Sequence, residues 1–464
     1  MEEQKTVNKI GQDFSFASLI RYLIPTMITQ FFFSVFKTVD DGLFVTNYVG
    51  TNALSAINIL FPYMVFTDAV AFLFATGGNA VCSRKMGEGK QEEAKASFTS
   101  VSIMIFIAVT VIAGISLIFQ DPILRLLGAT DVLMEDARIY STYMWVINPI
   151  TLLGPLFDFF YSTSGKPTMS IICAVINGIV NIIFDYLFIV VLQLGVRGAA
   201  MASSIGNIVF SVIGFVFYLN RKHEIHFTKP YTHWWKLFKE IFSVGMAQFF
   251  NQIAIAVSSF ISTIVILKIA GEDGLAAYSI VGYLQWLVGS GMGGFADGVS
   301  SIFSFNYGAG NKERIHRYFW YSIKFLAIAS VAIVAVSMIF AKPLISIYVQ
   351  EDSDKYIFDM VFRGMMMAPL ASLFSGYGMF SARFFTAMNN GRLSAFISFM
   401  RNGVLIAVTS IVLPMLLGID GVWLSGPVSE AIAAALITYI LYINRDNYAL
   451  GKNQFAHLIR DKVE

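Results

Sequence analysis

Long apolar segments recur almost from one end of the chain to the other, and this feature constrains the fold more than any other. Helices are expected near residues 17–47, 51–80, 94–119, 134–160, 168–192, 197–219, 238–268, 273–302, 315–339, 356–386, 393–416 and 421–445. Each segment is long enough to cross the ~30 Å hydrocarbon core of a bilayer as a helix. Charged residues make up 13% of the chain, whereas a soluble domain carries about 25%. The pattern predicts an all-α membrane protein with twelve transmembrane helices in contact with the lipid bilayer.

The composition also excludes several classes of protein. A net charge of +2 is too small to indicate a nucleic-acid partner. Cys82 and Cys173 match neither a disulfide framework nor a metal-ligand spacing. The sequence contains no G-x-x-x-x-G-K-S/T segment for nucleotide phosphates, and its five histidines form no catalytic cluster. We therefore expect a protein that is not an enzyme, that needs no cofactor and that is not driven by ATP hydrolysis within this chain.

The second half of the chain repeats the first half. One constant shift along the chain aligns Gly50 with Gly271, Gly77 with Gly298 and Gly87 with Gly308, and slightly larger shifts align Gly195 with Gly418, Gly198 with Gly421 and Asn177 with Asn402. Because each repeat holds an even number of helices, the two halves are parallel repeats about an axis along the membrane normal. The expected parts are a first lobe over 1–219, a cytoplasmic linker over 220–236, a second lobe over 237–446 and a cytoplasmic tail over 447–464.

Lysine and arginine concentrate on one side of this topology. With both termini in the cytoplasm, the inner side holds Arg84, Lys85, Lys90, Lys95, Lys166, Arg221, Lys222, Lys229, Lys236, Lys312, Arg314, Arg317, Arg392, Arg445, Lys452, Arg460 and Lys462, and the outer side mainly Arg125, Arg138, Arg197, Lys268, Lys342 and Lys355. Cytoplasmic loops carry the excess of positive residues. The bias predicts a multi-pass protein of the plasma membrane with both termini in the cytoplasm.

Several ordered segments resemble the multidrug and toxic compound extrusion (MATE) family. They are Val39-Asp40-Asp41-Gly42-Leu43-Phe44-Val45, Ser83-Arg84-Lys85-Met86-Gly87-Glu88-Gly89, Asn181-Ile182-Ile183-Phe184-Asp185-Tyr186, Ser304-Phe305-Asn306-Tyr307-Gly308 and Gly418-Ile419-Asp420-Gly421-Val422-Trp423. The resemblance implies two six-helix lobes arranged as a V around a central cavity. It also implies alternating access and export of organic cations against inward H⁺ or Na⁺.

The coupling ion is expected to bind in the first lobe. Ionisable residues at bilayer depth are costly and mark functional sites, and Asp41 and Asp185 lie within expected helices. Asn177, Asn181 and Asp185 are spaced four apart and share one helix face. The MATE resemblance points to the same place, because Asp41, Asn181 and Asp185 match the first-lobe cation site of bacterial members, and Ser203 stands where a hydroxyl ligand is common. Asp41, Asn181 and Asp185 would ligate a metal ion only if the ion is Na⁺. A structural hydrogen-bond network between helices is the alternative interpretation.

Lys37 complicates this site, because it can pair with either Asp40 or Asp41 on one helix. A Lys37–Asp41 pair would repel Na⁺, whereas a Lys37–Asp40 pair near the outer mouth would leave Asp41 free. We favour the second arrangement, and either one favours H⁺ over Na⁺ as the coupling ion.

The second lobe lacks a matching acidic site in the sequence. The helix over 238–268 carries Gln248, Asn251 and Gln252 with no carboxylate in its middle, which places coupling in the first lobe. Farther along, Arg401 and Glu430 are expected to form a structural buried ion pair, because a lone buried charge would be unstable.

The expected cargo is a small amphipathic cation. Asp158 lies among aromatic residues of the helix over 134–160, Asp68 lies in the helix over 51–80, and Phe157, Gln248 and Gln252 are further candidates for the cavity wall. Aromatic faces attract cations, although ordinary packing is the alternative for any single Phe. The leading function is a monomeric antiporter that exports such cations in exchange for H⁺ or Na⁺. The runner-up is a flippase or exporter of a lipid-linked or glycan precursor, which should have a cavity rich in Lys and Arg. A channel or a membrane enzyme fits the buried acids and the repeat less well.

Overall fold

The structure is a computed structural model that describes residues 9–39, 56–57, 59–346, 348–349, 355–446, 448 and 450. The first half forms a short turn η1 (Lys9–Gly11), then α1 (Phe16–Val39), α4 (Phe61–Gly87), α5 (Gln91–Ile118), α6 (Gln120–Leu127), α7 (Met134–Thr151), α8 (Leu153–Thr163), α9 (Thr168–Asp185), the π-helical segment η3 (Tyr186–Val191) and α10 (Val196–Leu219). Residues 220–233 connect the two halves. These bounds agree with the expected helices within a few residues, with two exceptions: the first helix is described only to Val39 and not to residue 47, and the second is described from Phe61 and not from residue 51.

The second half forms α11 (Trp234–Gly308), α12 (Lys312–Ile339), α13 (Ala341–Ile345), α14 (Lys355–Met367), η4 (Ala368–Ala371), α15 (Ser372–Ala387), α16 (Gly391–Phe399), the π-helical segment η5 (Met400–Leu405), α17 (Ile406–Leu417) and α18 (Ile419–Ile443). The 75 residues of α11 contain two expected helices, which are separated at Gly271. Gly271 has φ 63°, a left-handed conformation that glycine adopts without a Cβ penalty. The chain therefore changes direction at the glycine that the repeat aligns with Gly50.

Ten helical segments of the described chain are long and apolar enough to cross a membrane. The two remaining expected helices have identifiable reasons for a weaker apolar signal. Helix α7 carries Glu135, Asp136 and Arg138 in its first turns. The part of α11 after Gly271 is rich in glycine and serine. The described helices account for the twelve expected passes, so the predicted all-α fold is confirmed.

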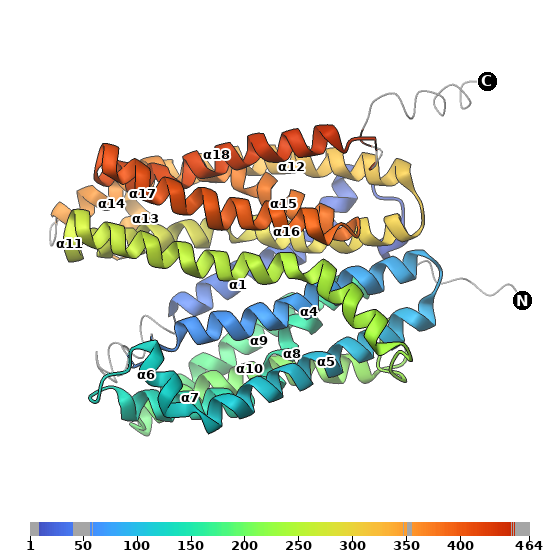
Figure 1. Cartoon of the computed structure of the whole chain (residues 1–464), viewed down its shortest axis with the longest axis horizontal. Coiled ribbons are helices and arrows are strands. Elements are labelled where there is room, and N and C mark those ends of the chain that lie inside the picture. Colours follow the sequence, from blue (N-terminus) through green and yellow to red (C-terminus); the bar gives the residue numbers. More distant parts are fainter. Residues whose placement is uncertain are drawn as a thin grey trace, which may run out of the picture.

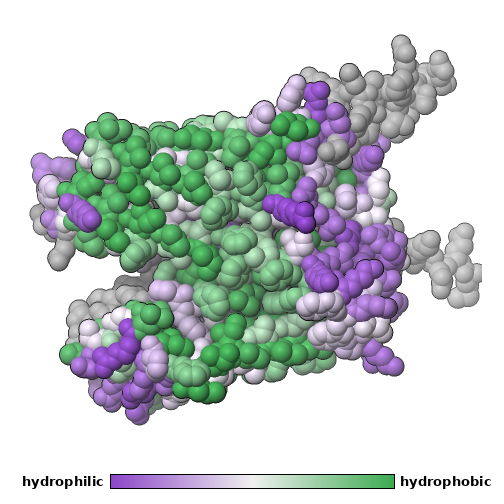
Figure 2. Space-filling view, viewed as in Figure 1, coloured by the Kyte–Doolittle hydropathy of each residue, from purple (hydrophilic) through white to green (hydrophobic). Residues whose placement is uncertain are grey.

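The helices form two lobes side by side (Figure 1). One lobe contains α4 to α10, the other contains most of α11 to α18, and α1 lies where they meet. We call the end that carries residues 220–233 the linker face and the end that carries α6 and α13 the cleft face. The space-filling view shows a cleft between the lobes at the cleft face and a dense group of hydrophilic residues at the linker face (Figure 2). The lobes thus diverge like a V from a closed end.

Aromatic side chains fill the centre of each lobe. Phe98 packs against Phe160 and Tyr218 in the first lobe, with ring centroids 4.8 and 4.7 Å apart. In the second lobe, Phe384 packs against Phe303 and Phe319, each at 5.2 Å. Lipid tails are as apolar as these rings, so close packing contributes more to helix association here than exclusion of water does.

Candidate functional site

The first lobe encloses a cavity of about 420 Å³ between α1, α4, α7, α8, α9 and α10. Its described lining contains two carboxylates, Asp68 and Asp158, and no Lys, Arg or His. Aromatic and thioether side chains make up much of the rest, namely Phe33, Phe72, Tyr140, Phe159, Phe210, Met64 and Met144. The amides and hydroxyls of Gln30, Thr67, Asn148, Thr151, Asn177, Ser203, Ser204 and Asn207 complete its polar part. The cavity therefore has a negative, aromatic and adaptable wall.

A break between α7 and α8 positions Asp158. Pro155 has no N–H to donate to the carbonyl of Thr151, so a regular helix cannot continue through this point. The Thr151 carbonyl instead accepts a hydrogen bond of 3.1 Å from the Ser211 hydroxyl of α10. Gly154 allows α8 to approach α10 closely, because a Cβ there would lie 2.6 Å from the ring of Phe210. The proline, the glycine and the serine together set the direction in which α8 presents Asp158.

Asp158 carries a buried carboxylate oxygen, Oδ1, to which no group in the described chain donates a hydrogen bond. The Ser170 hydroxyl of α9 is near the same carboxyl group, and Asp297 of the second lobe repels it electrostatically. A buried charge without full hydrogen bonding is destabilising. A cationic ligand in the cavity would relieve that penalty.

The amide residues of α9 continue the polar wall toward Asp185. Asn177 lines the cavity, while Asn181 and Asp185 are 8% and 1% exposed on the same helix. Helix α10 approaches this face closely at Gly206, where a Cβ would lie 2.8 Å from Asn177 Oδ1. The structure thus places Asn177 and Ser203 at the cavity, with Asn181 and Asp185 buried farther along α9.

The other predicted site residues have different positions. Asp40 and Asp41 lie outside the described residues. Phe157 does not line the cavity: it is 1% exposed and packs in the aromatic core against Phe98 and Tyr218. Helix periodicity explains this correction, because neighbouring residues of α8 face different directions and Asp158 and Phe159 take the cavity side.

Gln248 and Gln252 also lie away from the first-lobe cavity. Gln248 is buried, accepts a hydrogen bond from Arg383 and lines a second-lobe cavity of about 130 Å³ together with Asp297 and Arg401. Gln252 is partly exposed on α11 and lines none of the cavities described here. The sequence patterns did not indicate Gln30, Asn148 and Asn207 as cavity residues, although the four-residue spacing of Ser203 and Asn207 was an available signal.

A family comparison decides the identity of this fold. The family model described as MatE matches residues 25–187 and 248–412, which is more than half of the chain. The chain belongs to the MatE family. The two matched ranges fall in the two lobes, so the internal repeat is a repeat of the MatE unit itself.

Known relatives support a MatE transporter over nearly the full length. The multidrug export protein MepA of Staphylococcus saprophyticus is 25% identical over 445 residues, which cover 94% of this chain and 96% of that protein. A crystal structure of a MATE protein in complex with MaL6 superposes with a TM-score of 0.90 at 21% identity, covering 97% of this chain and all of the other. The outward-facing conformation of a multidrug resistance MATE family transporter superposes with a TM-score of 0.88 at 21% identity over the same shares. The MatE chain is a multi-pass membrane transporter.

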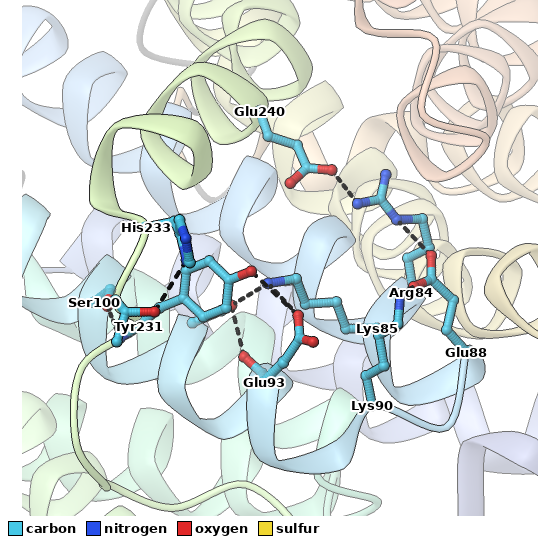
Figure 3. Close-up of polar contacts among 11 residues, drawn as sticks. Arg84, Lys85, Glu88, Lys90, Glu93, Ser100, Tyr231, His233 and Glu240 are labelled. Carbon is cyan, nitrogen blue, oxygen red and sulfur yellow. Dashed lines mark hydrogen bonds and ion pairs between the residues drawn. The ribbon is translucent and has the colours of Figure 1, made fainter.

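The linker face of this MatE transporter is closed by an ion pair between the lobes. Arg84 of α4 pairs with Glu240 of α11, and it also lies 3.4 Å from Glu88 on its own helix (Figure 3). Deeper in the interface, Asn79 Nδ2 donates a hydrogen bond of 2.9 Å to the Ser301 hydroxyl. Both residues are buried, at 3% and 0% exposure. These contacts join the lobes at the end opposite the cleft.

The linker folds onto the same end of the first lobe. The backbone N–H of Tyr231 donates to the Ser100 hydroxyl at 2.8 Å (Figure 3). The Tyr231 ring lies 3.7 Å from the Lys85 ammonium, a cation–π contact. Lys85 is 3.5 Å from Glu93, and burial together with the Glu93 carboxylate raises the pKa of the Tyr231 phenol. The linker is therefore a bound part of the closed end.

Proposed function

We propose that this MatE transporter exports small amphipathic organic cations in exchange for an inward-moving ion, by alternating access between its two lobes. The observation that carries the proposal is the first-lobe cavity, whose described lining has two carboxylates, a ring of aromatic and Met side chains, and no basic residue. The carboxylates suit the positive group of an amphipathic cation, and the aromatic and Met side chains suit its apolar part.

Each part of the wall has a role in recognition. The carboxylates of Asp68 and Asp158 attract the positive group of the cargo, and the faces of Phe159 and Phe72 attract it through cation–π contacts. Met64 and Met144 have flexible, polarisable side chains that adapt to cargo of varied shape. A cavity of about 420 Å³ falls within the range of small-molecule sites.

The coupling ion binds, in this proposal, at the buried end of the α9 polar face. Asp185 supplies the charge and Asn181 supplies an amide oxygen, with Asp41 as the second acid. H⁺ is the favoured ion, and Na⁺ would use Asp41, Asn181 and Asp185 as ligands. Ion binding must stabilise one lobe arrangement over the other, because an equal affinity for both states would shift nothing.

The direction of transport follows from the distribution of charge. The loops and adjoining helix ends at the linker face carry many Lys and Arg residues, such as Arg84, Lys85 and Lys312, and the positive-inside rule assigns such loops to the cytoplasm. In the plasma membrane, the cleft would then open outward and the closed linker face would have to separate to admit cargo from inside. The name of the relative MepA, a multidrug export protein, supports export of drug-like cargo. The transporter would act as a monomer, since each chain holds both lobes.

The alternative is a flippase or exporter for a lipid-linked or polyanionic glycan precursor. Such cargo requires basic side chains in the central cavity. The described lining of the first-lobe cavity is acidic, and the arginines of the small second-lobe cavity, Arg383 and Arg401, are each paired with a carboxylate. The polarity therefore favours cationic cargo.

Transport by the full-length protein in proteoliposomes tests the proposal. A fluorescent lipophilic cation is followed under an imposed pH gradient and, separately, under an imposed Na⁺ gradient. We expect uphill movement of the cation under one gradient and none when both are absent. A protein that moves no cation under either gradient but transfers an anionic lipid analogue between leaflets would overturn the proposal in favour of the alternative.

A further inference from the structure

The second lobe contains a cavity of about 180 Å³ that is separate from the small cavity around Gln248 and Arg383. We call it the second-lobe cavity, and it is lined by both parts of α11 and by η4, α17 and α18. These are the repeat counterparts of the helices around the first-lobe cavity. Individual lining positions agree as well. The shift that aligns Gly50 with Gly271 aligns Met64 and Ile147, which line the first-lobe cavity, with Gln285 and Ala368, which line the second-lobe cavity. The two cavities therefore occupy equivalent places in the two repeats.

The repeat also aligns the candidate ion site with hydroxyl groups. The Gly50–Gly271 shift places Ser262 opposite Asp41, and the shift that aligns Asn177 with Asn402 places Ser410 opposite Asp185. These two serines come together in the structure, where the Ser262 hydroxyl donates a hydrogen bond of 3.2 Å to the Ser410 oxygen. Both are buried, at 7% and 5% exposure, and both line the second-lobe cavity.

Two further candidate ion ligands of the first lobe, Asn181 and Ser203, are also replaced in the second lobe by residues that cannot supply a side-chain oxygen. Ile406 stands opposite Asn181 by the Asn177–Asn402 shift, and Gly426 stands opposite Ser203 by the shift that aligns the two Leu-Gly pairs before α10 and α18. Both line the second-lobe cavity, whose described lining contains no charged side chain. A positive charge is costly to bury where no side chain supplies a compensating negative charge. The lining of the second-lobe cavity therefore favours an uncharged occupant over a cation.

The lining indicates the class of that occupant. Tyr278 and Trp423 contribute aromatic rings, and their centroids are 6.3 Å apart. A serine hydroxyl donates one hydrogen bond and accepts two, so the Ser262–Ser410 pair can also bond a polar group of a ligand. A cavity of about 150 Å³ with apolar walls accommodates a benzene ring.

We propose that the second-lobe cavity is a binding site for uncharged single-ring aromatic molecules that carry one hydrogen-bonding group, such as phenols. The ring lies against Tyr278 and Trp423, and the polar group bonds the Ser262–Ser410 pair. This site goes beyond cation transport and does not depend on it.

Fluorine NMR on the full-length protein in detergent micelles tests the site. The probe is 4-fluorophenol, which is uncharged at pH 7 because phenols titrate near pH 10. Partition into protein-free micelles, which does not saturate, is measured separately and subtracted. We expect a saturable component with the wild-type protein. Gly282 lines the cavity and a Cβ there meets open space, so Gly282→Leu should abolish saturation while the matched Gly282→Ala keeps it.

A second variant separates the hydrogen bond from the ring contacts. Ser410→Ala should weaken binding of 4-fluorophenol by about five-fold, the effect of one hydrogen bond, and leave binding of fluorobenzene unchanged. It remains informative even if Gly282→Leu fails to fold. The proposal is wrong if the wild type shows no saturable binding, if Gly282→Leu in folded, transport-active protein binds equally well, or if a lipophilic cation fully displaces the phenol, which would place it in the first-lobe cavity.

Discussion

Gly87 and Gly308 occupy equivalent positions in the two repeats, and each lies against the backbone of the other's helix. A Cβ at Gly87 would overlap the carbonyl oxygen of Phe305, and a Cβ at Gly308 would overlap the carbonyl oxygen of Arg84. Phe305 and Arg84 are themselves related by the same shift as the two glycines. The two lobes therefore meet at the linker face through one reciprocal contact across the axis of the repeat, and only glycine fits at its two centres.

Gly87→Ala or Gly308→Ala should separate the lobes at the linker face. The overlap involves backbone atoms, which cannot rotate away, so the helices must move apart. Cys82 is fully buried near this interface and Cys173 is fully buried within the first lobe. We expect maleimide labelling of Cys82 to rise about ten-fold relative to Cys173, which corresponds to about 1.4 kcal/mol in the opening equilibrium.

The matched control for this experiment is Gly114→Ala in α5. A Cβ at Gly114 meets no atom of the described chain within 4 Å, so alanine there should improve helix propensity without changing the ratio of cysteine labelling. Equal labelling of Cys82 in Gly87→Ala and Gly114→Ala would show that the glycine contact does not hold the linker face closed.

Arg84 and Glu240 should act as a coupled pair. Their side chains are 13% and 26% exposed, so the pair is partly shielded from solvent. Arg84→Ala and Glu240→Ala should each destabilise the closed face, and a double-mutant cycle on cysteine labelling should give a coupling of about 1 kcal/mol. The exchange Arg84→Glu with Glu240→Arg should restore part of the wild-type value. Additive single effects with no recovery in the exchange would argue against the ion pair as a latch.

Much of the fold was predictable because a bilayer leaves few options. Backbone groups within lipid must be satisfied inside each segment, so apolar runs of sufficient length become helices. The expected ends of the helix over 197–219 match α10 within one residue. The break inside α11 was also predictable, because Gly271-Glu272-Asp273-Gly274 is a short polar segment between the helices expected over 238–268 and 273–302. The sequence did not show that the chain turns at Gly271 alone, with helical residues directly on either side.

The site was predictable in chemistry more than in geometry. An acid among aromatic residues suits a cationic cargo, which indicated Asp158 and, by analogy, Asp68 in the helix over 51–80, and both line the cavity. Phe157 packs in the aromatic core instead, because adjacent residues of α8 face different directions and the sequence does not show which of them faces the cavity. The Arg401–Glu430 pair was predicted from charge balance alone, and the structure confirms it with two contacts of 2.7 Å.

Asp158→Asn should weaken cation binding without unfolding the protein. Asparagine keeps the size and removes the charge, so the cavity loses about half of its negative character. We expect the affinity for a lipophilic cation to fall by at least about ten-fold, or ~1.4 kcal/mol, as measured by fluorescence anisotropy. Asp121→Asn is the matched control, because Asp121 is exposed, pairs with Arg138 and does not line the cavity. An unchanged affinity in Asp158→Asn would remove this residue from the recognition site.

Arg401 and Glu430 should stabilise the second lobe structurally. Their side chains are 8% and 14% exposed and form a two-contact pair. Arg401→Met leaves a buried carboxylate without its partner, which typically costs about 3–5 kcal/mol, and should lower the melting temperature in detergent. The double variant Arg401→Met with Glu430→Gln should recover much of that loss. A single variant as stable as the wild type would contradict the structural role.

The central claim is that ion coupling resides in the first lobe, and gradient-driven efflux of a lipophilic cation from proteoliposomes tests it most directly. The comparison is between Asp185→Asn and the second-lobe double variant Arg401→Met with Glu430→Gln, both alongside the wild type. The account predicts that Asp185→Asn abolishes uphill transport while binding of the cation persists, and that the second-lobe variant retains coupled transport. Coupled transport that survives Asp185→Asn but disappears in the second-lobe variant would contradict it.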